Sequence, residues 1–174
     1  MTKKPITLLI TTFKPTTNLL RIGAVTLTAA TALLAAGPAR ADTMTWTGTS
    51  YIVSQDRATG QFQRRGVAMF AGGEVATFTL AGQVTSFDPK VLTYNVKIVY
   101  TFEDGSTLQQ EGSGRNEVTT PPRTVQQGSG RLVGGTGRFE GVSGTTVSTG
   151  RALSEWDAIN QFKAEYSLPA KKRE

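Results

Sequence analysis

The sequence predicts an all-β protein whose strands form a closed antiparallel barrel or a sandwich. Seven or eight segments with strand character follow one another at short spacing, and no long segment has helical periodicity. The stretch 128–150 is rich in glycine, yet apolar residues stand between the glycines at spacings that suit strands. Glycines inside a strand pattern typically mark bulges, tight turns or barrel corners. The chain is therefore expected to bend often and to form no long helix.

Each strand is assigned from alternation of apolar and polar residues, bounded by turn residues. The expected strands are 44–54, 62–70, 74–84, 91–102, 107–118, 125–133, 139–151 and 162–168. The clearest is 91–102, where every second residue from Leu92 to Phe102 is apolar or aromatic. A period of two places these side chains on one face of a strand, whereas a helix would scatter them. This segment therefore predicts a strand with one face toward the core.

Turn residues separate the expected strands. Gly72-Gly73 and Asp104-Gly105 are typical of hairpin turns, and Pro121-Pro122 ends a strand because proline cannot donate to the ladder. The segment Gly-Ser-Gly-Arg at 112–115 recurs at 128–131, an interval of about one strand and its turn. The repeat therefore supports a series of short strands joined by turns.

The glycine-rich stretch is expected to turn the chain between the segments 125–133 and 139–151. Its glycines do not match a phosphate-binding loop, because the GxGxxG spacing and the following Lys-Ser/Thr are both missing. Arg138 is expected to pair with a carboxylate or a carbonyl group at the barrel rim. The residues assigned to this turn are Gly134, Gly135, Gly137, Arg138 and Gly141.

Residues 1–41 have the pattern of a secretory signal peptide, which leaves 42–174 as one domain with a short charged tail. Basic residues precede an apolar run at 22–36, and Ala39 and Ala41 supply the small residues that signal peptidase needs before Asp42. The run is shorter than the roughly 20 residues that cross a bilayer, so no membrane anchor is expected after cleavage. The protein is therefore expected to be exported, to a periplasm or out of the cell.

Removal of the signal changes the charge of the protein. The whole chain has 19 basic and 13 acidic residues and a net charge of +6. Five of the basic residues and none of the acids precede Asp42, so residues 42–174 carry 14 basic and 13 acidic residues, a net charge of +1. The basic excess that would favour a nucleic-acid partner leaves with the signal, so no nucleic-acid partner is expected.

The chain contains no cysteine and no histidine. A Ser-His-Asp triad, a Cys-His pair, a thiolate or imidazole zinc site and the usual haem ligation are therefore excluded by residue type. No cluster of acids has metal-ligand spacing, and no cofactor or metal is expected. Carboxylates, Tyr, Lys, Arg and hydroxyl groups remain for any reaction.

The segment 128–145, taken with 99–114 just upstream, resembles the barrel group that includes plant allene oxide cyclases, dirigent proteins and exported bacterial proteins. The most distinctive part is 132–144, Leu-Val-Gly-Gly-Thr-Gly-Arg-Phe-x-Gly-x-x-Gly. This resemblance implies an eight-stranded antiparallel barrel of lipocalin-like shape, with an interior that receives an apolar small molecule. It also implies a homo-oligomer, a dimer or a trimer. The plant cyclases position an unsaturated epoxide for ring closure, and their functional positions do not match this sequence residue by residue.

Candidate site residues follow from strand parity. The aromatic residues on core-facing positions predict either the wall of a ligand cavity or ordinary barrel filling. They are Trp46, Phe78, Tyr94, Tyr100 and Phe102. Glu74 shares parity with Phe78, so it is expected to point inward at a barrel end, where desolvation would raise its pKa and favour a role as catalytic acid or base. The alternative is that the Glu74 carboxylate is a gatekeeping charge at the end of the strand and has no catalytic role.

Three functions are consistent with these observations. The first is an exported barrel that binds a small apolar molecule in its interior. The second is an isomerase or cyclase whose cavity shapes an unsaturated substrate, which conformation and water exclusion can support without histidine or cysteine. The third is a structural or interaction protein with a filled barrel. An apolar cavity in the barrel would favour the first function, and a cavity with an inward carboxylate or tyrosine hydroxyl would favour the second. A solid interior would favour the third.

Overall fold

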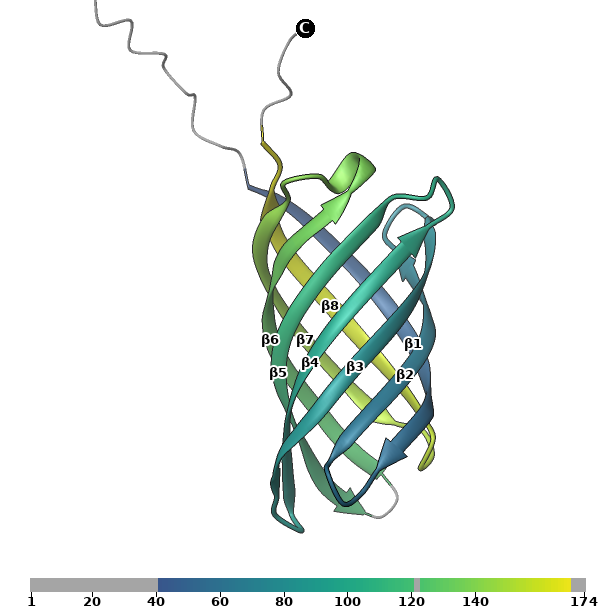
Figure 1. The fold of residues 1–174 in the computed structure, drawn as a ribbon, viewed down its shortest axis with the longest axis vertical. Helices are drawn as coiled ribbons and strands as arrows, with labels where there is room; N and C mark the ends of the chain where they lie inside the picture. Colours follow the sequence, from purple (N-terminus) through teal and green to yellow (C-terminus); the bar gives the residue numbers. More distant parts are fainter. Residues whose placement is uncertain (1–40, 121–122, 170–174) are drawn as a thin grey trace, which may run out of the picture. The chain divides into compact units, whose positions relative to one another are not determined.

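Eight strands follow one another in chain order around a closed antiparallel barrel (Figure 1). The computed structural model describes residues 41–120 and 123–169. The predicted signal segment lies outside these residues except for Ala41, and so does the end of the charged tail. The strands are β1 (Asp42–Asp56), β2 (Gln61–Phe70), β3 (Val75–Phe87), β4 (Val91–Phe102), β5 (Thr107–Thr120), β6 (Arg123–Thr136), β7 (Ser143–Ala152) and β8 (Asp157–Ser167).

Closure of the barrel is made by β1 and β8, whose residues pair from Asp42 with Tyr166 to Tyr51 with Asp157. Every other neighbouring pair is antiparallel and consecutive in sequence, as in a simple meander. The predicted eight-stranded antiparallel barrel is therefore confirmed. Closure pairs the edges of the first and last strands, which an open sheet would leave free.

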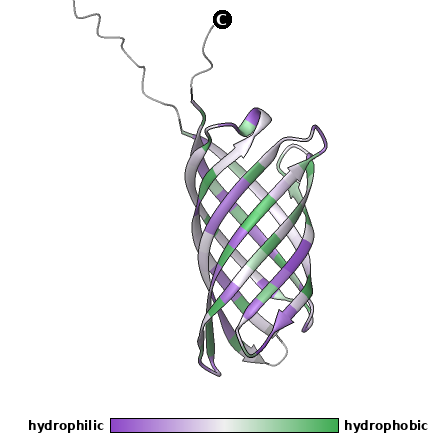
Figure 2. Cartoon of the chain, in the orientation of Figure 1, coloured by the Kyte–Doolittle hydropathy of each residue, from purple (hydrophilic) through white to green (hydrophobic). Residues whose placement is uncertain are grey.

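Alternation along each strand separates an interior face from an exterior face. Along β4, for example, Ile98, Tyr100 and Phe102 are buried, while Val99 and Thr101 between them are exposed. The mixture of hydrophilic and hydrophobic residues along each strand in Figure 2 reflects this period of two. Within the described ranges, no helix is long and apolar enough to span a membrane.

The glycine-rich stretch differs in detail from the prediction. β6 runs on to Thr136, a 3-10 turn η1 (Gly137–Phe139) follows, and β7 begins only at Ser143, so the predicted start at 139 is wrong. Gly137 and Gly141 have φ of 61° and 73°, the left-handed region that side chains other than glycine rarely adopt. β6 therefore ends three residues later, and β7 begins four residues later, than the sequence predicts.

The remaining predicted turn glycines belong to the strand itself. Gly134 lies at a register shift, where Gln109 pairs with Gly134 and Gln110 pairs with Leu132. This leaves Val133 as the extra residue of a β-bulge. A Cβ atom on Gly135 would stand 2.3 Å from the carbonyl oxygen of Thr107, so only glycine fits there. These two glycines bend and pack β6 rather than turn it.

One half of the barrel interior is a packed hydrophobic core. It lies toward the end where η1 connects β6 to β7, and Phe139 and Val142 close that end. The rings of Trp46, Phe70 and Tyr100 stack on or meet one another edge to face, with centroids 5.2–6.0 Å apart. The buried core residues are Trp46, Ala68, Phe70, Ala76, Phe78, Ile98, Tyr100, Phe102, Leu108, Leu132, Phe139, Val142 and Ala164.

Candidate functional site

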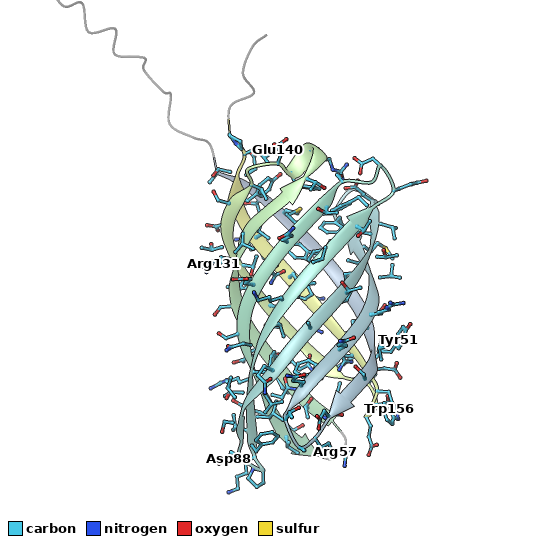
Figure 3. The ribbon with its side chains drawn as sticks, viewed as in Figure 1. Tyr51, Arg57, Asp88, Arg131, Glu140 and Trp156 are labelled. Carbon is cyan, nitrogen blue, oxygen red and sulfur yellow. The ribbon has the colours of Figure 1, made fainter. Side chains whose placement is uncertain are left out.

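The other half of the barrel interior contains a cavity. Its volume is about 160 Å³, roughly ten times the 10–15 Å³ that one water molecule needs by the same measure. The cavity lies toward the end formed by the β1–β2, β3–β4 and β7–β8 turns. Arg57, Asp88 and Trp156 mark this end in Figure 3, and Glu140 marks the opposite end.

Aliphatic and aromatic side chains make most of the cavity wall. β2, β3 and β4 supply Phe62, Leu80, Val84, Leu92 and Val96 from their interior faces. Phe162 enters from β8 and stacks on Trp46 of the core, with ring centroids 5.1 Å apart. The wall therefore offers an apolar surface that is continuous with the packed core.

Glycines form part of the opposite wall of the cavity. The two copies of the Gly-Ser-Gly-Arg repeat face each other across β5 and β6, with Gly112 paired to Gly130 and Gly114 paired to Gly128. Gly112 and Gly128 line the cavity. A Cβ atom on Gly114 would stand 2.5 Å from the Tyr94 hydroxyl, so this glycine makes room for the phenol. At Gly112 and Gly128, the repeat found in the sequence thus contributes backbone rather than side chains to the cavity wall.

A chain of buried hydrogen bonds crosses the barrel where the core meets the cavity. Trp46 Nε1 donates to the Tyr100 hydroxyl at 3.1 Å, and this hydroxyl donates to Gln110 Oε1 at 3.2 Å. Gln110 Nε2 then donates to Thr146 Oγ1 at 3.0 Å. Burial raises the pKa of Tyr100 far above its ordinary value, and the hydrogen bond from Trp46 offsets only part of this. Tyr100 therefore stays protonated and acts as a structural donor.

A second polar group lies nearer the open end of the cavity, around Arg64 of β2. Arg64 Nε donates to Ser50 Oγ at 3.0 Å, and Nη2 donates to the backbone oxygens of Ser50 and Trp156 at 3.2 and 2.9 Å. Tyr94 of β4 lines the same cavity, and its ring meets Phe62 edge to face. Burial raises the pKa of Tyr94, and the charge of Arg64 partly counteracts it.

Several amide and hydroxyl groups complete the lining. They are Gln110, Asn116, Gln126, Ser148 and Asn160. Asn116 Oδ1 is buried and has no hydrogen-bond partner among the described residues. An unpaired buried polar atom costs roughly 1–3 kcal/mol, so a partner that is supplied by a bound molecule would stabilise the protein.

The aromatic residues predicted from strand parity divide between the two halves of the interior. Tyr94 lines the cavity, Trp46, Tyr100 and Phe102 belong to the packed core, and Phe78 belongs to the core and also borders the cavity. Both readings that the sequence left open, cavity wall and barrel filling, thus occur in the same barrel. Parity alone does not distinguish them, because it fixes the face of a residue and not its height along the barrel axis.

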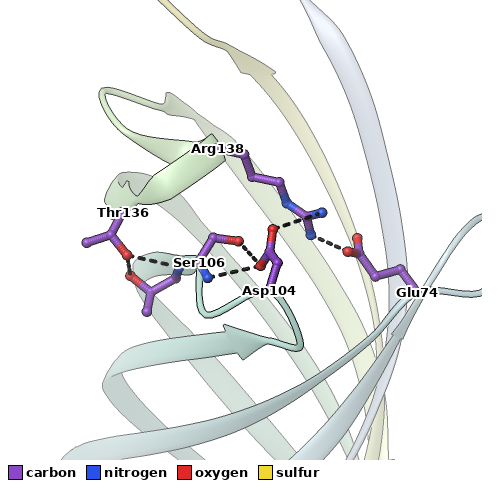
Figure 4. Close-up of polar contacts among 6 residues, drawn as sticks. Glu74, Asp104, Ser106, Thr136 and Arg138 are labelled. Carbon is purple, nitrogen blue, oxygen red and sulfur yellow. Dashed lines mark hydrogen bonds and ion pairs between the residues drawn. The ribbon is translucent and has the colours of Figure 1, made fainter.

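Glu74 differs from its expected position. It precedes β3, is exposed, and forms an ion pair with Arg138 at the rim opposite the cavity (Figure 4). Arg138 also pairs with Asp104 at 3.6 Å and lies over the rings of Phe102 and Phe139, 4.6 and 4.9 Å from their centroids. Its expected pairing at the rim is therefore present. These contacts join the β2–β3 and β4–β5 turns to η1, and they give Glu74 a structural partner.

Sequence reasoning did not identify Arg64 as part of a site. The alternation in the sequence could have pointed to it, because Arg64 shares parity with Phe62, Ala68 and Phe70. A cation on an apolar face is unusual unless it has a partner or a function. Within residues 41–120 and 123–169, no three His, Cys, Asp or Glu side chains lie close enough to hold a metal ion.

The fold and the cavity define a closed eight-stranded antiparallel barrel with a hollow half. No protein-family model and no curated protein matches the sequence. Among solved structures, the chain is similar to the pterocarpan synthase dirigent protein GePTS1, with a TM-score of 0.49 and 15% sequence identity. The match covers 78% of this chain and 89% of that chain.

Proposed function

We propose that this protein binds a small, largely apolar organic molecule inside its barrel. The observation that carries the proposal is the division of the interior. One half is packed, and the other half leaves a cavity of about 160 Å³ between Phe62, Leu80 and Val96 on one side and glycines on the other. Small-molecule sites typically combine such apolar walls with a few polar groups that orient the ligand. A barrel with a purely structural role has no need of this space.

Native mass spectrometry of the protein purified from its own host tests the proposal. We expect wild-type protein to carry a bound small molecule that denaturation releases. Val96→Phe should reduce the occupied fraction at least about tenfold, because the added ring takes up part of the cavity that Val96 lines.

Val99→Phe is the matched control. It makes the same change on the same strand, but Val99 is exposed on the outer face, so occupancy should stay within about twofold of wild type. Absence of any copurified molecule from wild-type protein, or equal occupancy in the two variants, would count against binding in the barrel interior.

An isomerase or cyclase is the second candidate, and one observation favours it. Tyr94 places a hydroxyl group in the cavity, and its raised pKa keeps that group protonated at neutral pH. A positioned phenol can donate a proton or hold a developing oxyanion. Chromatography of the copurified molecule distinguishes the two functions. If wild-type protein and Tyr94→Phe carry different isomers of equal mass, the protein is catalytic. If both carry the same isomer, it only binds.

A further inference from the structure

We infer that the bound molecule is an amphipathic anion, a carboxylate on an apolar body, and that Arg64 is the residue that recognises its charge. The inference rests on the proposed function, because it concerns the same cavity, and it names the chemical class of the ligand. Arg64 supports this class through its burial, its hydrogen-bond partners and its lack of an ion pair with any described carboxylate.

The first step is the missing counter-ion. Arg64 is half-buried and lines the cavity, yet no ion pair joins it to any carboxylate of the described residues. Glu174 is the one acidic residue of the chain that falls outside the described ranges. Asp157 acts on Arg64 through its charge only, and its carboxylate accepts a hydrogen bond from Ser154 at 2.8 Å. A buried cation is expensive unless it is paired, and a ligand carboxylate would pair it.

The second step is the unused capacity of the guanidinium group. Arginine has five N–H donors, and the neutral oxygens of Ser50 and Trp156 engage Nε and Nη2. Within the described part of the chain, Nη1 makes no hydrogen bond with the protein. Two donors therefore remain, and charge-assisted bonds to a carboxylate are the strongest that they can make.

The third step is that the guanidinium group is held in place before a ligand arrives. The Trp156 oxygen that accepts from Arg64 also accepts from the Ile52 backbone N–H at 2.9 Å. The Ser154 hydroxyl accepts from the backbone N–H groups of Trp156 and Asp157, both at 3.0 Å, and so fixes this turn. Arg64 is thus tied to β1 and to the β7–β8 turn, which reduces the entropy lost when it binds an anion.

The fourth step is a second donor in the same cavity. Tyr94 lies near enough for the charge of Arg64 to act on its phenol, and its hydroxyl makes no hydrogen bond to a described residue. A protonated phenol beside a cation suits one carboxylate group, and the charge of Arg64 repels a ligand cation. The apolar body of the ligand would then lie against Phe62, Leu80 and Val96.

Isothermal titration calorimetry with two matched pairs of probes tests the inference. The pairs are octanoate with octanamide, and phenylpropanoate with phenylpropanamide, so that only the charge differs within a pair. We expect wild-type protein to bind the acid of a pair about tenfold more tightly than the amide, the usual scale for one charge-assisted hydrogen bond. Arg64→Met should remove this preference and leave amide binding within about twofold.

Two further variants separate recognition from folding and from net charge. Arg64→Lys keeps the charge and should retain part of the preference even if Arg64→Met folds poorly. Arg65→Met removes the neighbouring arginine, which is exposed on the outer face of β2, and should leave the preference unchanged. Equal binding of acid and amide by wild-type protein, or an unchanged preference in Arg64→Met, would overturn the anion inference alone. Failure of wild-type protein to bind any of the four probes would count against interior binding itself.

Discussion

Replacing Tyr100 by alanine is expected to lower the free energy of unfolding by about 3–5 kcal/mol, as is typical when a buried aromatic ring is removed. Tyr100 is only 1% exposed and its ring meets those of Trp46, Phe70 and Phe78. Tyr100→Ala would leave a cavity among these rings and take away the hydroxyl on which the buried chain of hydrogen bonds depends. Urea denaturation followed by far-ultraviolet circular dichroism measures the loss.

Tyr100→Phe separates the ring from the hydroxyl. It keeps the packing but leaves Trp46 Nε1 without its acceptor and Gln110 Oε1 without its donor, so we expect a loss of about 1–3 kcal/mol. Thr101→Ala, on the exposed face of the same strand, should change stability by less than about 0.5 kcal/mol. If Tyr100→Ala cost no more than Tyr100→Phe, the ring would not be packed as described.

Replacing Gly130 by alanine is expected to cost about 2–3 kcal/mol, a large effect for the addition of one methyl group. A Cβ atom there would stand 2.3 Å from the carbonyl oxygen of Glu111 and 2.9 Å from the Cα atom of Gly112. Both are backbone atoms, so no rotation of a side chain relieves the clash, and β5 and β6 must move apart.

Gly48→Ala is the matched control on the interior face of β1. There the nearest atoms to an added Cβ belong to the rings of Phe78 and Phe162, at 3.3 and 3.6 Å, and these rings can shift slightly. The change in stability should stay within about 1 kcal/mol, because the loss of chain entropy in the unfolded state offsets the crowding. Equal losses for the two variants in urea denaturation would contradict the close approach of β5 and β6.

The predictions made from strand parity had a clear physical limit. The alternation in 91–102 correctly assigned Tyr94, Tyr100 and Phe102 to one face, because the period of two is a local property of an extended chain. It did not show that Tyr94 lines the cavity while Tyr100 lies in the packed core. That difference depends on which residues of the neighbouring strands lie at the same height along the barrel axis.

Glu74 illustrates the same limit at a strand end. Its parity with Phe78 suggested an inward carboxylate, but β3 begins one residue later, and Arg138 holds the side chain at the exposed rim. A catalytic role for Glu74 stays a prediction from the sequence. Arg64 was missed for the opposite reason. Its place on an apolar face was visible, but its hydrogen bonds reach Ser50 and the distant Trp156, which only the folded chain brings together.

The all-β architecture, the approximate strands, the main turns and the absence of histidine and thiol chemistry could be predicted from the sequence, because each depends on local pattern or composition. The packed end of the barrel and its hollow end became visible only in the folded chain, and so did the arginine that faces the hollow half and makes no ion pair with a described residue. The reason is register. Closing β1 onto β8 sets which side chains share a level of the barrel, and the cavity lies at the level where Gly112 and Gly128 stand in the wall instead of large side chains.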